Sequence, residues 1–125
     1  MLKIIKTCEL SGAALDWAVA KCEGLDYLAN PEYDGIGNRY EPTSYSTDWT
    51  QGGPIIEREM IQLTVQCRVN PLHGWAAAFR SFDEDDDVYA LHRMRGKTPL
   101  VAAMRCYVSS KLGDEVEIPE GLSND

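Results

Sequence analysis

The sequence lacks the features of a membrane-spanning or secreted protein. No apolar run approaches the roughly 18 residues that a membrane span requires, and the apolar stretch near Met1 is too short for a secretory signal. No two cysteines form a C-x-x-C pair, the spacing of many redox and zinc motifs. We therefore expect a cytosolic protein with free, mostly buried thiols at the four cysteines, Cys8, Cys22, Cys67 and Cys106.

Catalytic motifs are also missing. The chain contains no G-x-S-x-G, H-E-x-x-H or H-x-E pattern, and no nucleophile, base and orienting group can be assembled from it. The two histidines, His73 and His92, are not at metal-ligand spacing with each other or with a cysteine, and both are expected to be exposed. We expect no catalytic residue, no bound metal and no cofactor, although a Cys–His pair formed only in space remains an alternative.

Two segments of the sequence match only part of a known binding motif. The acidic run 83–87 has the first spacings of a calcium loop, but Val88 and Met94 stand where that loop needs glycine and glutamate. The tripeptide at 96–98 resembles the end of a P-loop, but Leu91 stands where its first glycine belongs. The acidic run is therefore read as a solvated turn, and a P-loop is rejected.

The charge balance disfavours a nucleic-acid polymer as a partner. Twenty acidic and twelve basic residues give a formal net charge of −8, which repels a polyanion. One local basic patch, at residues 92–97, precedes the last predicted helix and consists of His92, Arg93, Arg95 and Lys97. This patch either holds a phosphate near the helix N-terminus or balances the acidic run before it.

The chain length and the signals for helices and strands predict a single domain of the α+β class. At 125 residues the chain has the length of one domain. Ser11 and Gly24 bound one predicted helix, with a buried stripe of Leu15, Val19 and Cys22. Thr98 and Pro99 begin a second helix, predicted over 98–112 and ended by Gly113.

The strands are predicted from alternation of apolar and polar residues. Residues 61–67 alternate strictly, residues 75–80 read as a hairpin partner, and residues 88–91 as a third strand, which together form an antiparallel meander. Residues 2–6 are either a short strand or an ordered tail, and a short extended segment follows Asp114. The predicted fold is two helices packed on this small sheet, a single domain over 1–118 with an acidic tail at 119–125.

Residues 25–54 contain so many glycines, prolines and asparagines that no long regular element is expected there. A long loop rich in aromatic residues and glycine is typical of a binding loop or lid. Within and just after it, aromatic rings could stack on a ligand, Gly52 and Gly53 could let the backbone approach it, and Arg58 could pair with phosphate. The alternative is structural: the glycines shape a turn into the first meander strand, and Trp49 anchors the loop.

Three stretches of the sequence, 10–21, 46–59 and 98–108 with 111–116, resemble the NinX family of tailed bacteriophages. This is a family of small proteins of unassigned function found among accessory early genes of lambdoid phages. The resemblance implies a phage origin and the cytoplasm of an infected bacterium. It implies no mechanism.

Three functional hypotheses remain. The first is a non-catalytic protein that binds and sequesters a small nucleotide-like or phosphate-bearing molecule, such as a host immune signal, in a pocket between the 45–58 loop and the two helices. Its candidate residues are Trp17, Tyr45, Asp48, Trp49, Gln51, Gly52, Gly53, Pro54, Ile56, Arg58, Thr98 and Arg105. The second is an acidic inhibitor or DNA mimic that docks on a host nuclease or recombination protein. The third is a hydrolase of a nucleotide signal. No residue requires a homo-oligomer, although a symmetric dimer is common at this size.

Overall fold

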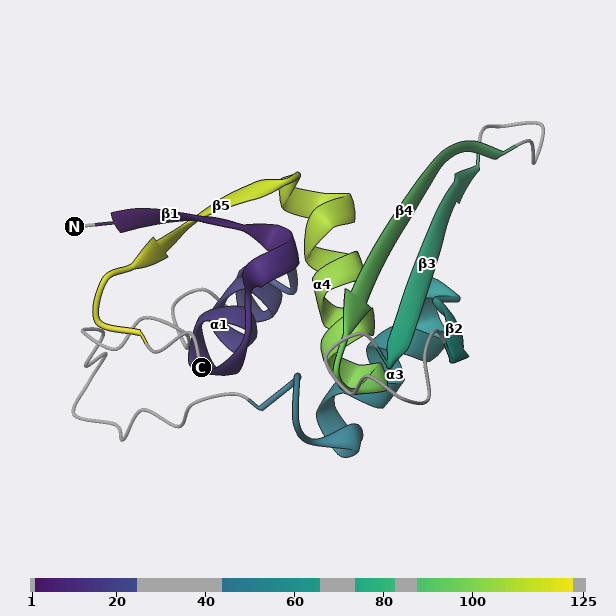
Figure 1. Ribbon diagram of the computed structural model, residues 1–125, viewed down its shortest axis with the longest axis horizontal. Helices are drawn as coiled ribbons and strands as arrows, with labels where there is room; N and C mark the ends of the chain where they lie inside the picture. Colours follow the sequence, from purple (N-terminus) through teal and green to yellow (C-terminus); the bar gives the residue numbers. More distant parts are fainter. Residues whose placement is uncertain (1, 25–43, 66–73, 83–87, 123–125) are drawn as a thin grey trace.

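Helix α4 (Pro99–Leu112) forms the centre of the chain in the computed structural model, which describes residues 2–24, 44–65, 74–82 and 88–122 (Figure 1). The helix begins as predicted, because the Thr98 hydroxyl accepts a hydrogen bond from the Val101 amide at 3.1 Å and Pro99 occupies the first turn. It ends before Gly113, whose φ of 88° suits glycine. The helix predicted over 98–112 is therefore confirmed.

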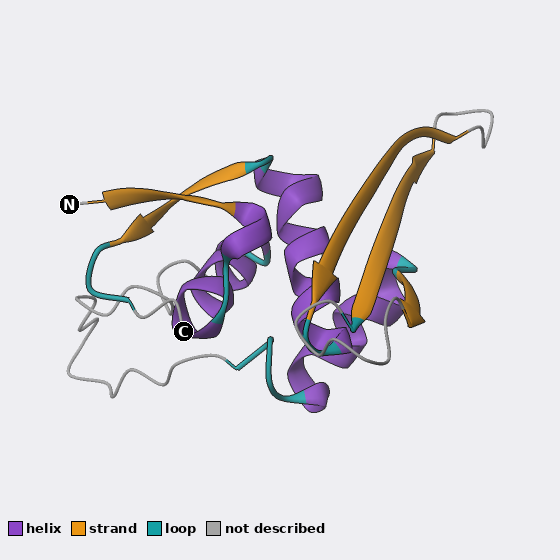
Figure 2. Cartoon of the chain, in the orientation of Figure 1, coloured by secondary structure: helices purple, strands orange, loops and turns teal. Residues whose placement is uncertain are grey.

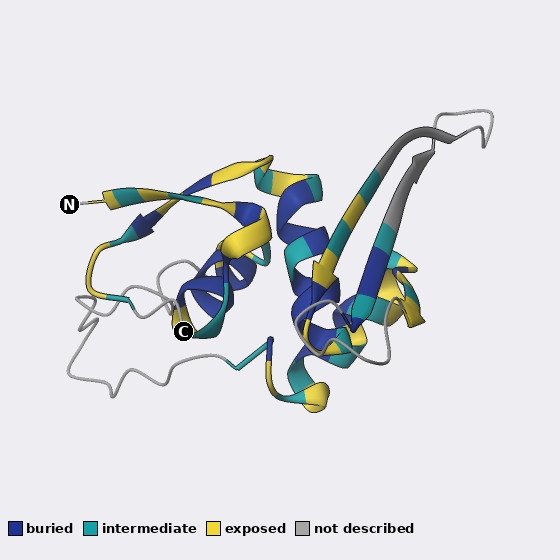
Figure 3. Ribbon diagram, in the orientation of Figure 1, coloured by how far each residue is buried: buried dark blue, intermediate teal, exposed yellow. Residues whose placement is uncertain are grey.

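Burial of α4 is wider than the single stripe that the sequence predicts. Val101, Met104 and Val108 are buried as expected, but Ala102 and Ala103 on other faces are also fully buried (Figure 3). The cause is its position between two layers: α1 (Gly12–Cys22) lies on one side, and strands β3 (Trp75–Phe82) and β4 (Val88–Gly96) lie on the other. Small alanine side chains allow both layers to approach the helix closely.

The predicted meander is confirmed as a three-stranded antiparallel sheet of order β2-β3-β4 (Figure 2). Its strands are β2 (Gln62–Val65), β3 (Trp75–Phe82) and β4 (Val88–Gly96). Ala77 is buried and Trp75 packs against the core, as the alternation predicts. Val65 is an exception: it was expected inside, but it lies exposed at the end of the short edge strand. The side chain of Phe79, the third residue expected to face inward, lies outside the described part of the structure.

Strand β4 is longer than the predicted 88–91, and it contains most residues of the basic patch. Residues 92–96 pair with β3 from Phe79 back to Trp75, so alternate side chains point to opposite faces of the sheet. His92 and Met94 are half-buried, whereas Arg93 and Arg95 are exposed. The expectation of an exposed His92 is therefore corrected. The acidic run 83–87 and His73 lie outside the described residues.

A second, two-stranded sheet joins the two ends of the chain. Strand β1 (Leu2–Lys6) pairs antiparallel with β5 (Glu115–Pro119), and Ile5 lies opposite Val116 in the register. Both extended segments were predicted, but their pairing was not. The inward residues Val116 and Ile118 of β5 are buried against the core. Leu122 also packs on that core, and residues 123–125 lie outside the described part.

Helix α1 follows its prediction. Ser11 is the N-cap residue, Leu10 and Leu15 of the predicted hydrophobic staple are both fully buried, and Gly24 follows the helix with a φ of 78°. A short 3₁₀ turn, η1 (Thr7–Glu9), connects β1 to α1. The buried stripe holds α1 against α4, so these two helices form the apolar centre together.

The expectation of no long regular element over 25–54 is wrong at its end, where α3 (Trp49–Glu59) begins. Asp48 caps this helix by accepting a hydrogen bond from the Thr50 amide at 2.9 Å. Pro54 lies inside the helix, where its missing N–H costs one backbone hydrogen bond. Burial of Ile55 against the core offsets that cost. The fold therefore has three helices among its described residues, and the α+β class is confirmed. Residues 25–43 lie outside the described part.

Candidate functional site

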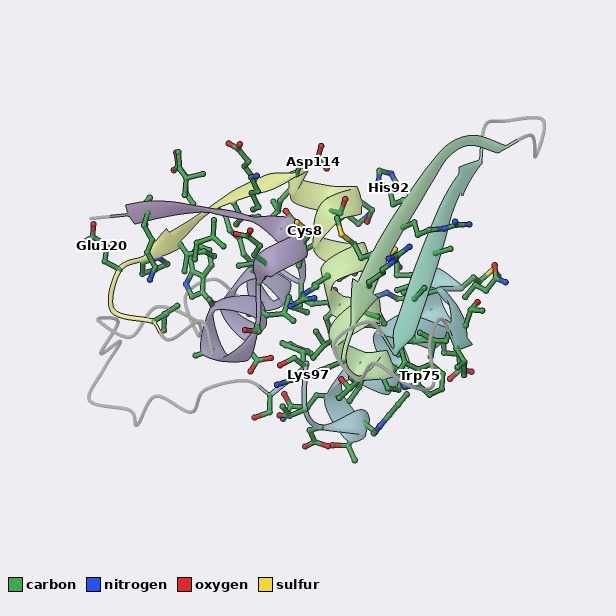
Figure 4. All side chains as sticks on the ribbon, viewed as in Figure 1. Cys8, Trp75, His92, Lys97, Asp114 and Glu120 are labelled. Carbon is green, nitrogen blue, oxygen red and sulfur yellow. The ribbon has the colours of Figure 1, made fainter. Side chains whose placement is uncertain are left out.

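The predicted ligand-binding residues divide into groups that the fold uses differently. Most of them lie on α3 or in the turn before it, and α3 packs beside α4 near the end of the sheet where β3 begins (Figure 1). Trp75 and Lys97 mark that same end of the sheet (Figure 4). The location of each predicted side chain shows which groups are available to a ligand and which are occupied within the protein.

Trp49 is the most available of the predicted groups. It occupies the first position of α3, and 52% of its surface is exposed. Gly53, one turn later, lies under the edge of the indole: a Cβ at Gly53 would be 3.7 Å from Trp49 Cε3. Ile56 follows on the same flank and packs partly on the core, and Met60 ends the helix with 83% of its surface exposed. We call Trp49, Gly53, Ile56 and Met60 the α3 stripe.

Gly52 does not open the backbone to a ligand on its Cβ side. A Cβ there would lie 2.4 Å from the Tyr45 carbonyl oxygen and 2.6 Å from Leu100 Cδ2. The glycine therefore lets α3 dock closely on α4 and on the preceding turn. Tyr45 itself is partly buried against the core, and this burial raises the pKa of its hydroxyl. The expected role of the glycine pair is thus divided, with Gly52 facing the interior and Gly53 facing the Trp49 ring.

Asp48 and Gln51 hold the turn that leads into α3. The Asp48 carboxylate accepts hydrogen bonds from the Thr50 hydroxyl at 2.7 Å and the Thr50 amide at 2.9 Å, and these bonds lower the pKa of Asp48. Gln51 Oε1 accepts a hydrogen bond from the Ser44 amide at 2.8 Å. Because the helix N-terminus already holds a carboxylate, a second anion there would be repelled. Pro54 is exposed on the helix surface.

Arg58 is the centre of a polar cluster that joins three helices. Its guanidinium makes a bidentate pair with Glu23 at 3.0 and 2.7 Å and donates to Glu59 at 2.9 Å. It also donates to the Tyr107 hydroxyl at 3.2 Å, and that hydroxyl donates to Glu23. Lys111 of α4 lies 3.9 Å from Glu59. We call these five residues the Arg58 cluster.

The titration of this cluster follows from its contacts. Hydrogen bonding to Arg58 lowers the pKa of Glu23, whereas burial raises the pKa of Tyr107. Burial, with the charge of Glu23 nearby, raises the pKa of the Cys22 thiol to about 12. That thiol is therefore protonated near neutral pH and is a poor nucleophile. The cluster therefore holds the ends of α1 and α3 against α4.

The remaining predicted residues are also occupied. Arg105 donates to the carbonyls of Leu10 at 2.7 Å and Arg95 at 2.8 Å, and burial lowers the pKa of its guanidinium. Thr98 caps α4. Trp17 is only 8% exposed, and the ammonium of Lys21 lies 5.3 Å from its ring centroid. Its buried indole N–H has no hydrogen-bond partner within the described residues.

Some contacts that organise this region had no signal in the sequence. The backbone amide of Ser46 donates to Asp16 Oδ1 at 2.8 Å, which ties the turn before α3 to α1. Burial raises the pKa of this carboxyl, against the lowering effect of the Ser46 bonds. Glu23 and Tyr107 were missed as partners of Arg58 because they lie 35 and 49 positions away. No cluster of metal-ligating side chains and no helix long and apolar enough to cross a membrane occurs within the described ranges.

Within the described ranges, these observations define an α+β fold with three helices, two antiparallel sheets and one flank of exposed apolar side chains. The chain belongs to the family described as bacteriophage P22 NinX, whose family model matches residues 6–111. No curated protein matches the chain. The family assignment confirms the resemblance, and it carries no assigned function.

Proposed function

We propose that this phage-family protein is a non-catalytic binding protein that captures a small nucleotide-like or phosphate-bearing molecule at the α3 stripe. In an infected bacterial cytoplasm, such a protein would sequester its ligand from the host, and an immune signal is the ligand that would make sequestration useful to a phage. The exposed indole of Trp49 would stack on the flat part of the ligand.

The exposure of Trp49 is the observation that carries this proposal. A tryptophan left half in water forgoes a large part of the roughly 1.5–3 kcal/mol that burial of a large apolar side chain provides. The helix that carries the ring is also closely docked. Asp48 fixes the first turn of α3, and Gly52 docks the helix against Tyr45 and Leu100. A preformed aromatic surface on a rigid helix loses little conformational entropy when it binds a flat ligand.

Arg58 is half-exposed in the last turn of this helix, and it could contact a phosphate only by giving up its bidentate pair with Glu23. A phosphate offers the same paired oxygens as a carboxylate, and the exchange would conserve the geometry of the guanidinium. Arg105 is held by two backbone carbonyls and has less freedom to exchange. Trp49 is therefore the decisive residue for this proposal.

The test begins with native mass spectrometry of the protein purified from phage-infected bacteria, followed by denaturation and chromatography of the released material. A stoichiometric, intact small molecule is the expected result. The same preparation is then made with Trp49→Ala and with Leu2→Ala. The second variant is a control that removes an equally exposed apolar side chain from the β1-β5 sheet. The ligand should be lost from the first variant alone. Retention by Trp49→Ala, or recovery of a hydrolysed product, would refute the proposal.

A second candidate function is binding to a host protein, and Met60 is the observation that favours it. The α3 stripe runs from Trp49 to Met60, which is longer than one stacked base needs, and aromatic residues and methionine are enriched at protein interfaces. The net charge of −8 would suit a basic partner. If this is the function, a host polypeptide co-purifies in place of a small molecule, and Met60→Asp releases it while Leu2→Asp does not.

A further inference from the structure

The face of the β2-β3-β4 sheet that points away from α4 carries a regular arrangement of polar side chains. The register aligns two rows across the three strands: Gln62, Ala78 and Arg93 form one row, and Thr64, Ala76 and Arg95 form the next. The opposite face holds Leu63, Ala77 and Met94, which pack on the core. Each outer row therefore has a hydrogen-bonding group on β2, an alanine in the middle and an arginine on β4.

The alanines make this face hollow. A depression of about 110 Å³ lies over the strand centres, and its lining consists of Gln62, Thr64, Ala76, Ala77, Ala78 and Arg93. Neighbouring strands are about 4.8 Å apart, so each row spans roughly 10 Å, and the two rows are about 7 Å apart along the strands. Ala76 and Ala77 on its floor are only 6% and 1% exposed, so an anion would lie at the mouth of the depression, beside Gln62, Thr64 and Arg93.

Arg93, which lines the depression, and Arg95, which lies on the same face of β4, are not neutralised by any described residue. Arg93 and Arg95 are exposed, and the ion pairs among the described residues are those of Arg58 and Lys111. The carbonyl of Arg95 accepts a hydrogen bond from Arg105, which fixes the backbone of β4 and leaves the Arg95 guanidinium outside that contact. Two like charges on one face of a strand repel each other, and an anion between them would remove that repulsion.

We infer that this sheet face is a binding site for a small molecule with two or more linked phosphates. The planar fork of a guanidinium matches phosphate oxygens bidentately, and two arginines whose backbone positions are about 7 Å apart along β4 can each reach a different phosphate of one chain. Gln62 and Thr64 supply neutral donors from the opposite rim. A small ligand is favoured over a nucleic-acid polymer, because the net charge of −8 acts on every phosphate of a long chain.

This site goes beyond the proposed function, because it lies on the sheet and not on the α3 stripe. It also changes the interpretation of the basic patch at 92–97. The patch does not act as one cluster at the start of α4, because strand alternation separates Arg93 and Arg95 from His92. Phosphate recognition is instead assigned to the two arginines that share the outer face.

The test is isothermal titration calorimetry of the whole chain with inorganic tripolyphosphate. Binding is expected, and Arg93→Gln and Arg95→Gln should each weaken it roughly tenfold or more, since a hydrogen bond to a charged group contributes about 1.5–3 kcal/mol. Lys6→Gln removes one positive charge from an exposed position on the other sheet and should leave the affinity within about twofold. Circular dichroism would verify that all three variants fold.

A further variant separates shape from charge. Ala78→Leu keeps both arginines but fills the depression, so it should also weaken tripolyphosphate binding. Equal affinity in the wild type and both arginine variants would overturn the inference, as would an equal loss in Lys6→Gln. Tighter binding to a single-stranded oligonucleotide than to tripolyphosphate would overturn the assignment to a small ligand. None of these outcomes depends on Trp49, so failure here leaves the proposed function standing.

Discussion

Two adjacent glycines of α3 provide the sharpest test of how this helix is docked. Gly52→Ala would place a Cβ 2.4 Å from the Tyr45 carbonyl oxygen and 2.6 Å from Leu100 Cδ2. The leucine could rotate, but the closer atom belongs to the backbone, so α3 or the preceding turn must move. Gly53→Ala would meet only Trp49 Cε3 at 3.7 Å, an ordinary contact. Both positions are in the same helix, so the intrinsic preference for alanine is the same for both.

The magnitudes follow from these contacts. Alanine is favoured over glycine inside a helix by about 1 kcal/mol, so Gly53→Ala should raise the free energy of unfolding by up to that amount. At Gly52 the same gain is opposed by overpacking, which costs about 1–3 kcal/mol and rises when backbone must shift. The two variants should therefore differ by about 2 kcal/mol, with Gly52→Ala the less stable. A difference of that size corresponds to a Tm difference of roughly 6–10 °C for a domain of this length.

Thermal and urea unfolding followed by circular dichroism would measure both values. Agreement between the two methods on the order of stability, with Gly53→Ala above the wild type, is the expected result. If Gly52→Ala is as stable as Gly53→Ala, then α3 does not pack against Tyr45 and Leu100 as described. The rigid mounting of Trp49, and with it the argument for a preformed stacking surface, would then fail.

Three further predictions concern other contacts of the helices. The ion pair with Arg58 lowers the pKa of Glu23, so this pair stabilises the fold by about 1 kcal/mol above the ordinary pKa of 4.5. This stabilisation is lost as pH falls through the lowered pKa. The free energies of unfolding of the wild type and Glu23→Gln, measured in urea, should therefore become equal in acid. Iodoacetamide should label exposed Cys8 quickly and Cys22, whose thiol has a pKa of about 12, only after unfolding, as peptide mass mapping would show. Thr98→Ala removes the cap of α4 and should lower the free energy of unfolding by about 1 kcal/mol in the same urea assay.

The parts of the fold that the sequence predicts well are those with local signals. The start of α4 is encoded by two adjacent residues, Thr98 and Pro99, and its end by Gly113. Alternation over 61–67 depends only on neighbours and located β2, and residues 75–80, predicted as its hairpin partner, match the start of β3. The third strand was predicted to end at Leu91 because the basic side chains that follow were interpreted as a surface patch, so β4 was predicted too short.

Helix α3 was missed because its determinants are not local. Glycine and proline were read as helix breakers, which is correct for an isolated peptide. At Gly52, however, the absent side chain is what permits contact with Leu100, which lies 48 positions away in the sequence. Tertiary packing repays the cost of the glycines and of Pro54. The pairing of β1 with β5 was missed for the same reason, since the partner strands lie at opposite ends of the chain.

The candidate site shows why residue type alone does not tell which groups are free to contact a ligand. Arginine was predicted to bind phosphate at positions 58 and 105, and in the fold both side chains form internal hydrogen bonds. The sequence gives no sign of this, because Glu23 and the carbonyl of Leu10 come together with them only in the fold. Arg93 and Arg95 were noted for their charge, but the register of β4 is what places both on one open face.

We therefore assign binding in this protein to groups that the fold leaves available, and not by residue type alone. Stability accounts for Arg105, which donates to two backbone carbonyls, and for Arg58, which pairs with Glu23. It does not account for the exposed ring of Trp49 or for two arginines without an anionic partner among the described residues, because neither arrangement adds to the free energy of unfolding. Groups that a fold positions rigidly and leaves unsatisfied are those from which a ligand can gain the most. The α3 stripe and the open sheet face are accordingly where substitutions should alter binding while leaving the protein folded.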